Sequence, residues 1–197
     1  MNDRMRIGVF GGTFDPIHST HLSIALAAMA QARLDRVLFV VSARPPHKVD
    51  ELLADPEDRL AMVEAAVADH PGFEASRIEL DRMGPSYTVE TLAAVERQYP
   101  DSERFLIIGM DALADLPNWR EPDTILNRSR ILVAPRPNAP APPDSLSAAY
   151  QVLDVPPCDL SSTEVRRRIV AREPLDDMLP KAVQRVIAEK GLYREIT

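Results

Sequence analysis

The sequence predicts an α/β protein with a doubly wound, Rossmann-like parallel sheet and C-terminal helices packed at its edge. Short apolar runs rich in β-branched residues alternate with longer segments in which apolar residues recur every three or four positions. Two short runs, Arg36–Val41 and Arg104–Ile108, contain almost no polar residues, as is typical of strands buried on both faces of a parallel sheet. Strands that alternate with helices favour right-handed βαβ crossovers and a parallel sheet.

Each expected strand is a short apolar run. In chain order the strands are Met5–Phe10, Arg36–Val41, a run marked by Ile78 and Leu80, Arg104–Ile108, Arg130–Ala134 and Tyr150–Val155. The first expected helices have apolar residues at helical spacing, and two of the later ones, Asp111–Leu116 and Asp123–Asn127, are short helical stretches. In chain order the helices are Leu22–Ala32, Glu57–Asp69, Val89–Tyr99, Asp111–Leu116, Asp123–Asn127, one starting near Ser161, and Pro180–Lys190. Pro180 suits the first position of the last helix, and Gly191 suits the position just after its end.

Length and composition favour one globular domain. The chain has 197 residues, of which 45% are hydrophobic and 27% charged, enough to bury a substantial core. We expect a single domain over residues 1–197, with 160–197 as its C-terminal helical part. The sequence has no apolar run of 18 residues and no signal-peptide pattern, and its only cysteine, Cys158, excludes an intrachain disulfide. These features predict a cytoplasmic protein without a membrane partner.

Charge and proline content limit the partners. The formal net charge of -7 disfavours general nucleic-acid binding, although it is compatible with a local basic pocket. Five of the 18 prolines lie in Pro135–Pro143, which we expect to be an extended surface connector, with a lid or a subunit contact as alternatives. The sequence shows no heptad pattern and leaves a homo-oligomer open.

Candidate site residues follow the strands. In a doubly wound sheet, ligands bind beyond the carboxyl ends of the strands near the topological switch point. Four segments at such positions carry unusual residues. They are Gly11–His21, Ser42–Lys48, Gly109–Asp111 and Asp159–Arg168.

The first of these segments predicts a phosphate site. Gly11 and Gly12 permit a tight turn that brings backbone amides close to a phosphate. His18 and His21 are three residues apart, so at a helix start they face the same side. Two imidazoles suit a metal or a phosphate. We favour phosphate because the sequence shows no companion His or Cys motif for a metal.

The last segment has the features of a second phosphate site. Ser161 followed by Glu164 forms a capping box that starts a helix. The free N–H groups and positive dipole at such a helix start attract phosphate, and Arg166 adds a planar bidentate donor. Taken alone, this pattern is equally typical of a well-capped surface helix.

Together the two segments resemble the H-x-x-H nucleotidyltransferase superfamily, whose members bind ATP or CTP, transfer a nucleotidyl group and release pyrophosphate. The first signature is Gly-Gly-Thr-Phe-Asp-Pro-Ile-His-x-x-His and the second is Ser-Ser-Thr-x-x-Arg. The superfamily has glycine before the second histidine, where this chain has Thr20. Three intermediate segments resemble the bacterial nicotinate mononucleotide adenylyltransferases within it. These segments are Pro45–Lys48, Ser86–Leu92 and Ile108–Leu113 with Asn118-Trp119.

The resemblance implies roles for individual residues. The implied catalytic residues are His18, His21, Lys48 and Arg166. The implied ATP-binding residues are Gly11, Gly12, Thr13, Phe14, His18, His21, Gly109, Asp111, Ser162, Thr163 and Arg166. The implied acceptor-binding residues are Thr13, Lys48, Tyr87, Thr88 and Trp119, with Trp119 stacked on the acceptor ring. Asp111 could bind ribose hydroxyls or only cap the next helix, and Arg44 would add positive charge near Lys48.

The implied activity is transfer of AMP from ATP to nicotinate mononucleotide, which gives deamido-NAD and pyrophosphate. Mg²⁺ would enter with ATP, and no protein metal site is expected. Three alternatives stay open. These are the same chemistry on nicotinamide mononucleotide, the same chemistry on phosphopantetheine, and a non-catalytic nucleotide-binding regulator.

Overall fold

The protein is built around one sheet of six parallel strands. The computed structural model describes residues 4–43, 54–137, 139–147, 149–156 and 160–194. The strand order is β3-β2-β1-β4-β5-β6, the order of a doubly wound dinucleotide-binding fold. The strands are β1 Arg6–Gly12, β2 Arg36–Val41, β3 Phe73–Ser76, β4 Glu103–Gly109, β5 Arg130–Ala134 and β6 Tyr150–Val152. The chain reverses its direction across the sheet between β1 and β4, which are neighbours.

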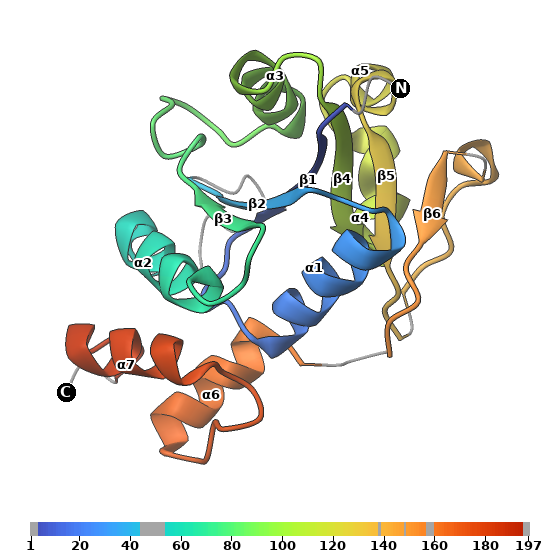
Figure 1. The fold of residues 1–197 in the computed structure, drawn as a ribbon. Coiled ribbons are helices and arrows are strands. Elements are labelled where there is room, and N and C mark those ends of the chain that lie inside the picture. The colour runs from blue at the N-terminus through green and yellow to red at the C-terminus, as the bar shows by residue number, and fades with distance from the viewer. Residues whose placement is uncertain (1–3, 44–53, 138, 148, 157–159, 195–197) are drawn as a thin grey trace.

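Helices cover both faces of the sheet (Figure 1). The helices are α1 Ser19–Gln31, α2 Pro56–Val67, α3 Thr88–Gln98, α4 Met110–Asp115, α5 Pro122–Arg128, α6 Ser162–Ala171 and α7 Lys181–Lys190. One apolar core joins the sheet to α1, α2, α6 and α7, and a second core joins it to α3, α4 and α5. Single 3-10 turns lie at Leu116–Asn118 and Asp144–Leu146. The predicted fold class is therefore confirmed.

The C-terminal helices belong to the first core. Val165 of α6 and Val183 of α7 are fully buried in it, and α7 packs against α2. The segment between the two helices also contacts the start of α1, where the Ser19 backbone N–H donates to the Met178 carbonyl at 2.8 Å. Gly191 ends α7 with a φ of 66°, as predicted for a residue just after a helix. No helix within the described ranges is long and apolar enough to cross a membrane.

One predicted strand is wrong. Ile78 and Leu80 lie in turns, and β3 is formed instead by Phe73–Ser76, which pairs with Val37–Val40. The apolar side chains of Ile78 and Leu80 pack against the two cores from these turns, so their burial does not require a strand. Gly72, with a φ of 85°, provides the turn that leads into the true strand.

Candidate functional site

A cavity of about 660 Å³ lies at the carboxyl ends of β1, β4 and β5. This is the position expected for a ligand in this topology, beside the switch point between β1 and β4. Several predicted site residues line the cavity. They are His18, His21, Gly109, Ser162 and Thr163, and the walls also include Phe10, Ser19, Thr20, Ser161 and Arg136. The sheet thus brings the first and last candidate segments, about 140 residues apart, to one cavity.

Direct contacts join the two segments. The Ser162 hydroxyl at the start of α6 donates to the Pro16 carbonyl at 3.0 Å. The Arg166 guanidinium donates to the Asp15 carbonyl at 2.7 Å. Ser161 is the N-cap of α6, and its hydroxyl accepts from the Glu164 backbone N–H at 3.2 Å. The start of this helix, where the first backbone N–H groups have no partner within the helix, therefore lies at the cavity that His18 also lines.

The two histidines stack beside each other, as their spacing predicts. Their ring centroids are 3.8 Å apart. The His18 backbone N–H donates to Nδ1 of His21 at 3.2 Å, which leaves Nε2 of a neutral His21 to carry the ring proton. The His18 side chain is buried, and its Nδ1 has no hydrogen-bond partner among the described residues. A buried imidazole nitrogen without a partner at a cavity wall is typical of a group that binds a ligand.

Burial also sets the charge of this pair. It lowers the pKa of His18 from 6.5 to about 4. It lowers the pKa of His21 well below 6.5, and the nearby His18 adds a smaller repulsive effect. Both rings are therefore neutral at pH 7 without a ligand. Because a polyphosphate would favour the imidazolium form, ligand binding should draw protons onto the pair.

A buried carboxylate holds the first segment in place. Asp15 is 2% exposed, and its Oδ1 accepts from the Tyr193 hydroxyl at 2.7 Å and from the Ala54 backbone N–H at 3.1 Å. Its Oδ2 lies 3.4 Å from the Arg166 guanidinium. Asp15 therefore joins the segment after β1 to α6, to the segment before α2 and to the segment after α7. Burial and the negative charge of Asp15 raise the pKa of Tyr193.

Arg59 of α2 binds backbone carbonyls of the same region. Its guanidinium is 1% exposed and donates to the carbonyls of Thr13 and Ser42, both at 2.7 Å, and to Ala54 at 3.0 Å. These carbonyls lie after β1, after β2 and before α2. A buried guanidinium requires such acceptors, since a charge without them would be strongly destabilising. Arg59 was not identified from the sequence, where it reads as an ordinary polar helix residue.

The two glycines after β1 have different surroundings. A Cβ on Gly12 would lie 2.8 Å from the Phe14 ring, whereas a Cβ on Gly11 would meet nothing within 4 Å. Gly12 is thus required for close packing of Phe14. The Phe14 side chain is 2% exposed and meets the His21 ring edge-on at 5.2 Å. Phe14 therefore supports His21, and any contact of Phe14 with a nucleotide would come from its backbone.

Three of the predicted acceptor residues, Tyr87, Thr88 and Trp119, do not line this cavity. Tyr87 is the N-cap of α3, Thr88 is the first residue of that helix, and Trp119 follows the 3-10 turn after α4. The Arg120 guanidinium lies 4.8 Å from the centre of the Tyr87 ring, and the Trp119 indole N–H donates to Asp115 at 3.2 Å. Both aromatic rings pack against the second core. Lys48, a further predicted acceptor residue, and Arg44 lie outside the described residues.

Arg136 was missed by the sequence interpretation. It follows β5 and lines the cavity, and it forms an ion pair with Asp111 at 2.6 Å. The rule that ligands bind after strands would have identified it, but the prolines around it favoured a simple connector. Asp111 sits in the first turn of α4, and Thr13 contributes its carbonyl to Arg59. Neither Asp111 nor Thr13 lines the cavity.

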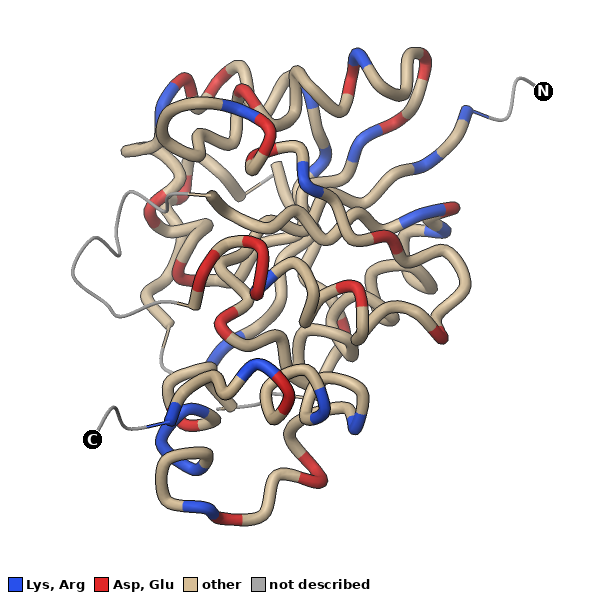
Figure 2. The backbone as a smooth tube through the Cα atoms, turned by 90° about the vertical axis from the view of Figure 1, so that its left-hand side faces the viewer, with Lys and Arg blue, Asp and Glu red and all other residues tan. Residues whose placement is uncertain are grey.

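The described residues contain no group of three or more His, Cys, Asp or Glu side chains arranged to hold a metal ion. Acidic and basic residues are interspersed along the chain on the side of the molecule in Figure 2. The polar side chains that line the cavity are the two histidines, Arg136 and hydroxyl-bearing residues of α1 and of the start of α6.

The chain is similar to known proteins in both sequence and fold. Residues 9–168 match the family model of cytidylyltransferase-like proteins. A nicotinate-nucleotide adenylyltransferase from Bacillus subtilis is 37% identical, with 95% of this chain and 98% of the relative covered. A "probable nicotinate-nucleotide adenylyltransferase" from Thermus thermophilus is 46% identical, with 96% and 100% covered. A solved Plasmodium falciparum nicotinic acid mononucleotide adenylyltransferase, complexed with NaAD, has a similar fold. Its TM-score is 0.77 at 16% identity, with 96% of this chain and 98% of that chain covered.

The lowered histidine pKa can be measured. We expect the ring proton signals of His18 to titrate near pH 4 in the ligand-free protein, and to titrate at higher pH with bound ATP. Because the folded pKa lies below the unfolded value of 6.5, the contribution of His18 to folding is full above pH 6.5 and is lost as the pH falls toward 4. NMR titration, with His18→Gln to assign the signal, tests this. A ligand-free His18 that titrates at 6.5 would contradict it.

Removal of the Tyr193 hydroxyl should weaken ATP binding through Asp15. In Tyr193→Phe the carboxylate loses a 2.7 Å donor and draws Arg166 more strongly, so less of that guanidinium is available to phosphate. We expect ATP to bind on the order of tenfold more weakly, because a hydrogen bond to a charged group contributes about 1.5 kcal/mol or more. Calorimetry measures this, and Tyr99→Phe, which loses a partly buried hydroxyl beside Glu74 and outside the cavity lining, is the matched control. Unchanged ATP affinity in Tyr193→Phe would show that Asp15 does not act on Arg166.

Proposed function

Because the chain belongs to the nicotinate-nucleotide adenylyltransferases, within the cytidylyltransferase-like family, we propose that it moves AMP from ATP to nicotinate mononucleotide. The products are deamido-NAD and pyrophosphate, so the enzyme acts in NAD biosynthesis. One observation supports this most directly. Two segments suited to phosphate, the His18–His21 pair and the start of α6, meet at one cavity beside the switch point.

The reaction requires positioning more than covalent help. A phosphate oxygen of the acceptor attacks the α-phosphorus of ATP in line, the bond to the β-phosphate oxygen breaks, and pyrophosphate leaves. Negative charge builds on the transferring group, and donors held in advance around it lower the barrier. In our proposal His18 and His21 donate to the phosphates near the reacting phosphorus. Lys48 would supply a further cation there.

The start of α6 would hold the leaving phosphates. The backbone N–H groups of Ser162 and Thr163 lie at the positive end of the helix dipole. Arg166 already uses one amino group on Asp15, and its second lies 3.4 Å from the Thr163 hydroxyl. A phosphate could replace that long contact with a charge-assisted hydrogen bond. Gly109, at the end of β4, would let the nucleoside approach the sheet closely.

Mg²⁺ fits this arrangement as an ion carried by the substrate. Mg²⁺ keeps several waters and commonly binds through phosphate oxygens with few protein ligands. The cavity lining contains histidine, hydroxyl and guanidinium groups, which can donate to phosphate, and none of these lining residues is a carboxylate. When bound, the ion would neutralise charge on the departing pyrophosphate. In our proposal no side chain among the described residues is dedicated to the metal.

The acceptor ring would lie toward Trp119 and Tyr87. Both are aromatic, half-buried and located after β3 and β4, on the side of the second core. A flat pyridine ring can stack on an indole, and backbone amides near Thr88 could donate to a nicotinate carboxylate. The proposed partners are thus ATP and nicotinate mononucleotide in the cytoplasm, and a homo-oligomer stays compatible with the proposal.

Pyrophosphate release tests the proposed reaction. The assay contains ATP and Mg²⁺ with nicotinate mononucleotide, nicotinamide mononucleotide or 4′-phosphopantetheine as the acceptor. The proposal expects the highest kcat/KM with nicotinate mononucleotide. A preference for another acceptor would contradict the assigned ring pocket. Binding of ATP without release of pyrophosphate from any acceptor would support a regulator instead.

Loss of His18 should abolish most turnover. We expect His18→Ala to lower kcat at least about a hundredfold, the effect of losing a main donor to the transferring group. The fold should be intact, as judged by circular dichroism and melting temperature. His70→Ala is the matched control, because His70 follows α2 and does not line the cavity. A His18→Ala enzyme with near wild-type kcat would remove His18 from the reaction.

Loss of Trp119 should chiefly affect the acceptor. We expect Trp119→Ala to raise the KM for nicotinate mononucleotide about tenfold or more, because ring stacking contributes about 1 kcal/mol beyond area burial. The KM for ATP should change little. Trp119→Phe keeps a flat ring, so it should retain most of the acceptor affinity. An equal loss of affinity for both substrates would point to damage of the second core.

A further inference from the structure

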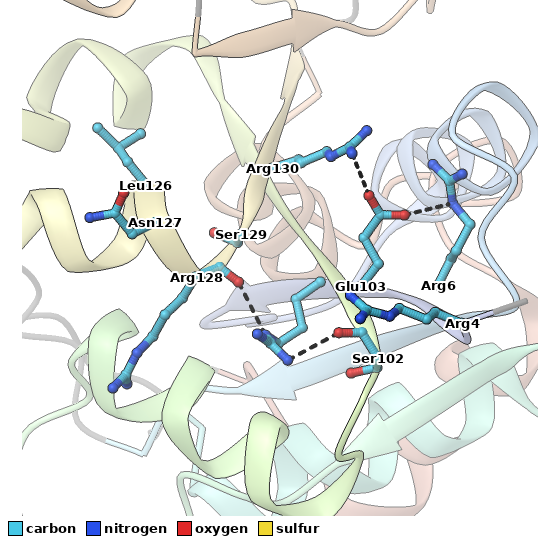
Figure 3. Close-up of a pocket in the computed structure, with 10 residues that line it drawn as sticks. Arg4, Arg6, Ser102, Glu103, Leu126, Asn127, Arg128, Ser129 and Arg130 are labelled. Carbon is cyan, nitrogen blue, oxygen red and sulfur yellow. Dashed lines mark hydrogen bonds and ion pairs between the residues drawn. The ribbon is translucent and has the colours of Figure 1, made fainter. Parts of the chain in front are cut away.

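Arginines gather at the opposite end of the sheet from the candidate site. The amino ends of β1, β4 and β5 surround a cavity of about 480 Å³. It is lined by Arg4, Arg6, Ser102, Glu103, Arg104, Leu126, Asn127, Arg128, Ser129 and Arg130. Figure 3 shows Arg6 and Arg130 on either side of Glu103, with Arg4 beside them and Arg128 directed away from that group. We refer to this place as the arginine cavity.

The arginine cavity has an excess of positive charge. Glu103 pairs with Arg130 at 2.7 Å and with Arg6 at 3.6 Å. Glu96, outside the lining, pairs with Arg104 at 3.0 Å and with Arg128 at 3.8 Å. A third carboxylate, Asp35, is bound by the backbone N–H of Arg6 at 2.7 Å. Among the residues in or next to the cavity lining, five guanidiniums therefore outnumber three carboxylates. This local excess occurs in a chain whose formal net charge is -7.

These arginines differ in what they are free to bind. Arg104 is committed to the fold, since it donates to the carbonyls of Arg128 and Ser102, both at 3.1 Å. Arg130 is 70% exposed, and Glu103 is its ion-pair partner within the described ranges. Arg4 forms no ion pair in the part of the chain that the structure describes. Arg4 and Arg130 can therefore accept an anion without loss of a buried contact.

Arg6 provides a further indication. Its guanidinium carbon lies 4.8 Å from the centre of the Phe105 ring, and that of Arg130 lies 5.9 Å from the same ring. The buried ring thus holds two cations in place before any ligand arrives. Nε of Arg6 is buried and has no hydrogen-bond partner among the described residues, and its ion pair with Glu103 is long. A donor left in this state is costly unless another acceptor approaches.

We propose that the arginine cavity binds a small anion that carries two or more phosphate groups, held mainly by Arg6 and Arg130. Planar guanidiniums match phosphate oxygens with paired hydrogen bonds, and several of them favour a ligand with several negative charges. In this proposal the Glu103 side chain rotates away from Arg6 and Arg130, and phosphate oxygens take its place between the two guanidiniums. This site is separate from the cavity at the carboxyl ends and does not depend on the proposed reaction.

Inorganic triphosphate without metal is the probe. NMR of the arginine Nε–H groups follows each guanidinium, and calorimetry gives the number of ions bound per chain. The proposal expects saturable shifts of Arg6 and Arg130, separate from those of Arg166. It also expects one more bound ion for the wild-type protein than for the Arg6→Gln/Arg130→Gln variant. The single variant Arg130→Gln, at an exposed position, should weaken this binding at least tenfold without affecting the fold.

Arg36→Gln is the matched control. Arg36 begins β2 at the same end of the sheet and pairs with Glu74, but it does not line the cavity. Triphosphate binding should be unchanged in this variant. The proposal is overturned if triphosphate shifts only residues of the carboxyl-end cavity, or if Arg130→Gln and Arg36→Gln bind it equally. Because the readout is binding, a failure of AMP transfer would leave this result unaffected.

Discussion

The buried Asp15 carboxylate is the interaction on which the candidate site depends. It belongs to the segment after β1 and contacts a group from each of three others: the segment before α2, the first turns of α6 and the segment after α7. A buried charge is tolerated only when its partners are supplied, so these four segments must come together for the protein to fold well. Arg59 has the matching role for carbonyls of the same region. The contacts of Asp15 and Arg59 that stabilise the fold thus lie next to the place where substrate phosphates would bind.

This arrangement would allow a protein of net negative charge to bind polyphosphates. The histidines are neutral without a ligand because burial lowers their pKa, so the empty cavity does not hold two adjacent positive charges. Phosphate would bring the charge that makes protonation favourable. The remaining donors are largely backbone N–H groups at the start of α6. These groups carry no formal charge, so a phosphate would not have to break an ion pair to reach them. Binding strength would then come from geometry set by Asp15 more than from net charge.

The sequence predicted the fold class and most element positions because strands β2 and β4 have nearly continuous apolar patterns with clear ends. It failed at Ile78 and Leu80, where apolar side chains reach the cores from turns. It also predicted that His18, His21, Ser162 and Thr163 would meet, since the resemblance rests on both signatures. Arg59 and Tyr193 were missed because they bind residues far away in the sequence, and no local pattern reports such contacts. Arg59 donates to the Thr13 carbonyl, 46 residues away, and Tyr193 donates to the Asp15 carboxylate, 178 residues away. The positions of Tyr87 and Trp119 relative to the cavity likewise depend on long-range packing.

A double-mutant cycle on ATP affinity tests the central claim most directly. The variants are Asp15→Asn, Arg166→Gln and the two combined, and circular dichroism confirms that each is folded. If Asp15 acts by positioning Arg166, the loss in the combined variant should be clearly smaller than the sum of the single losses, with a coupling of about 0.5 kcal/mol or more. Additive losses would mean that the two residues influence ATP independently, and would contradict the role assigned to the buried carboxylate.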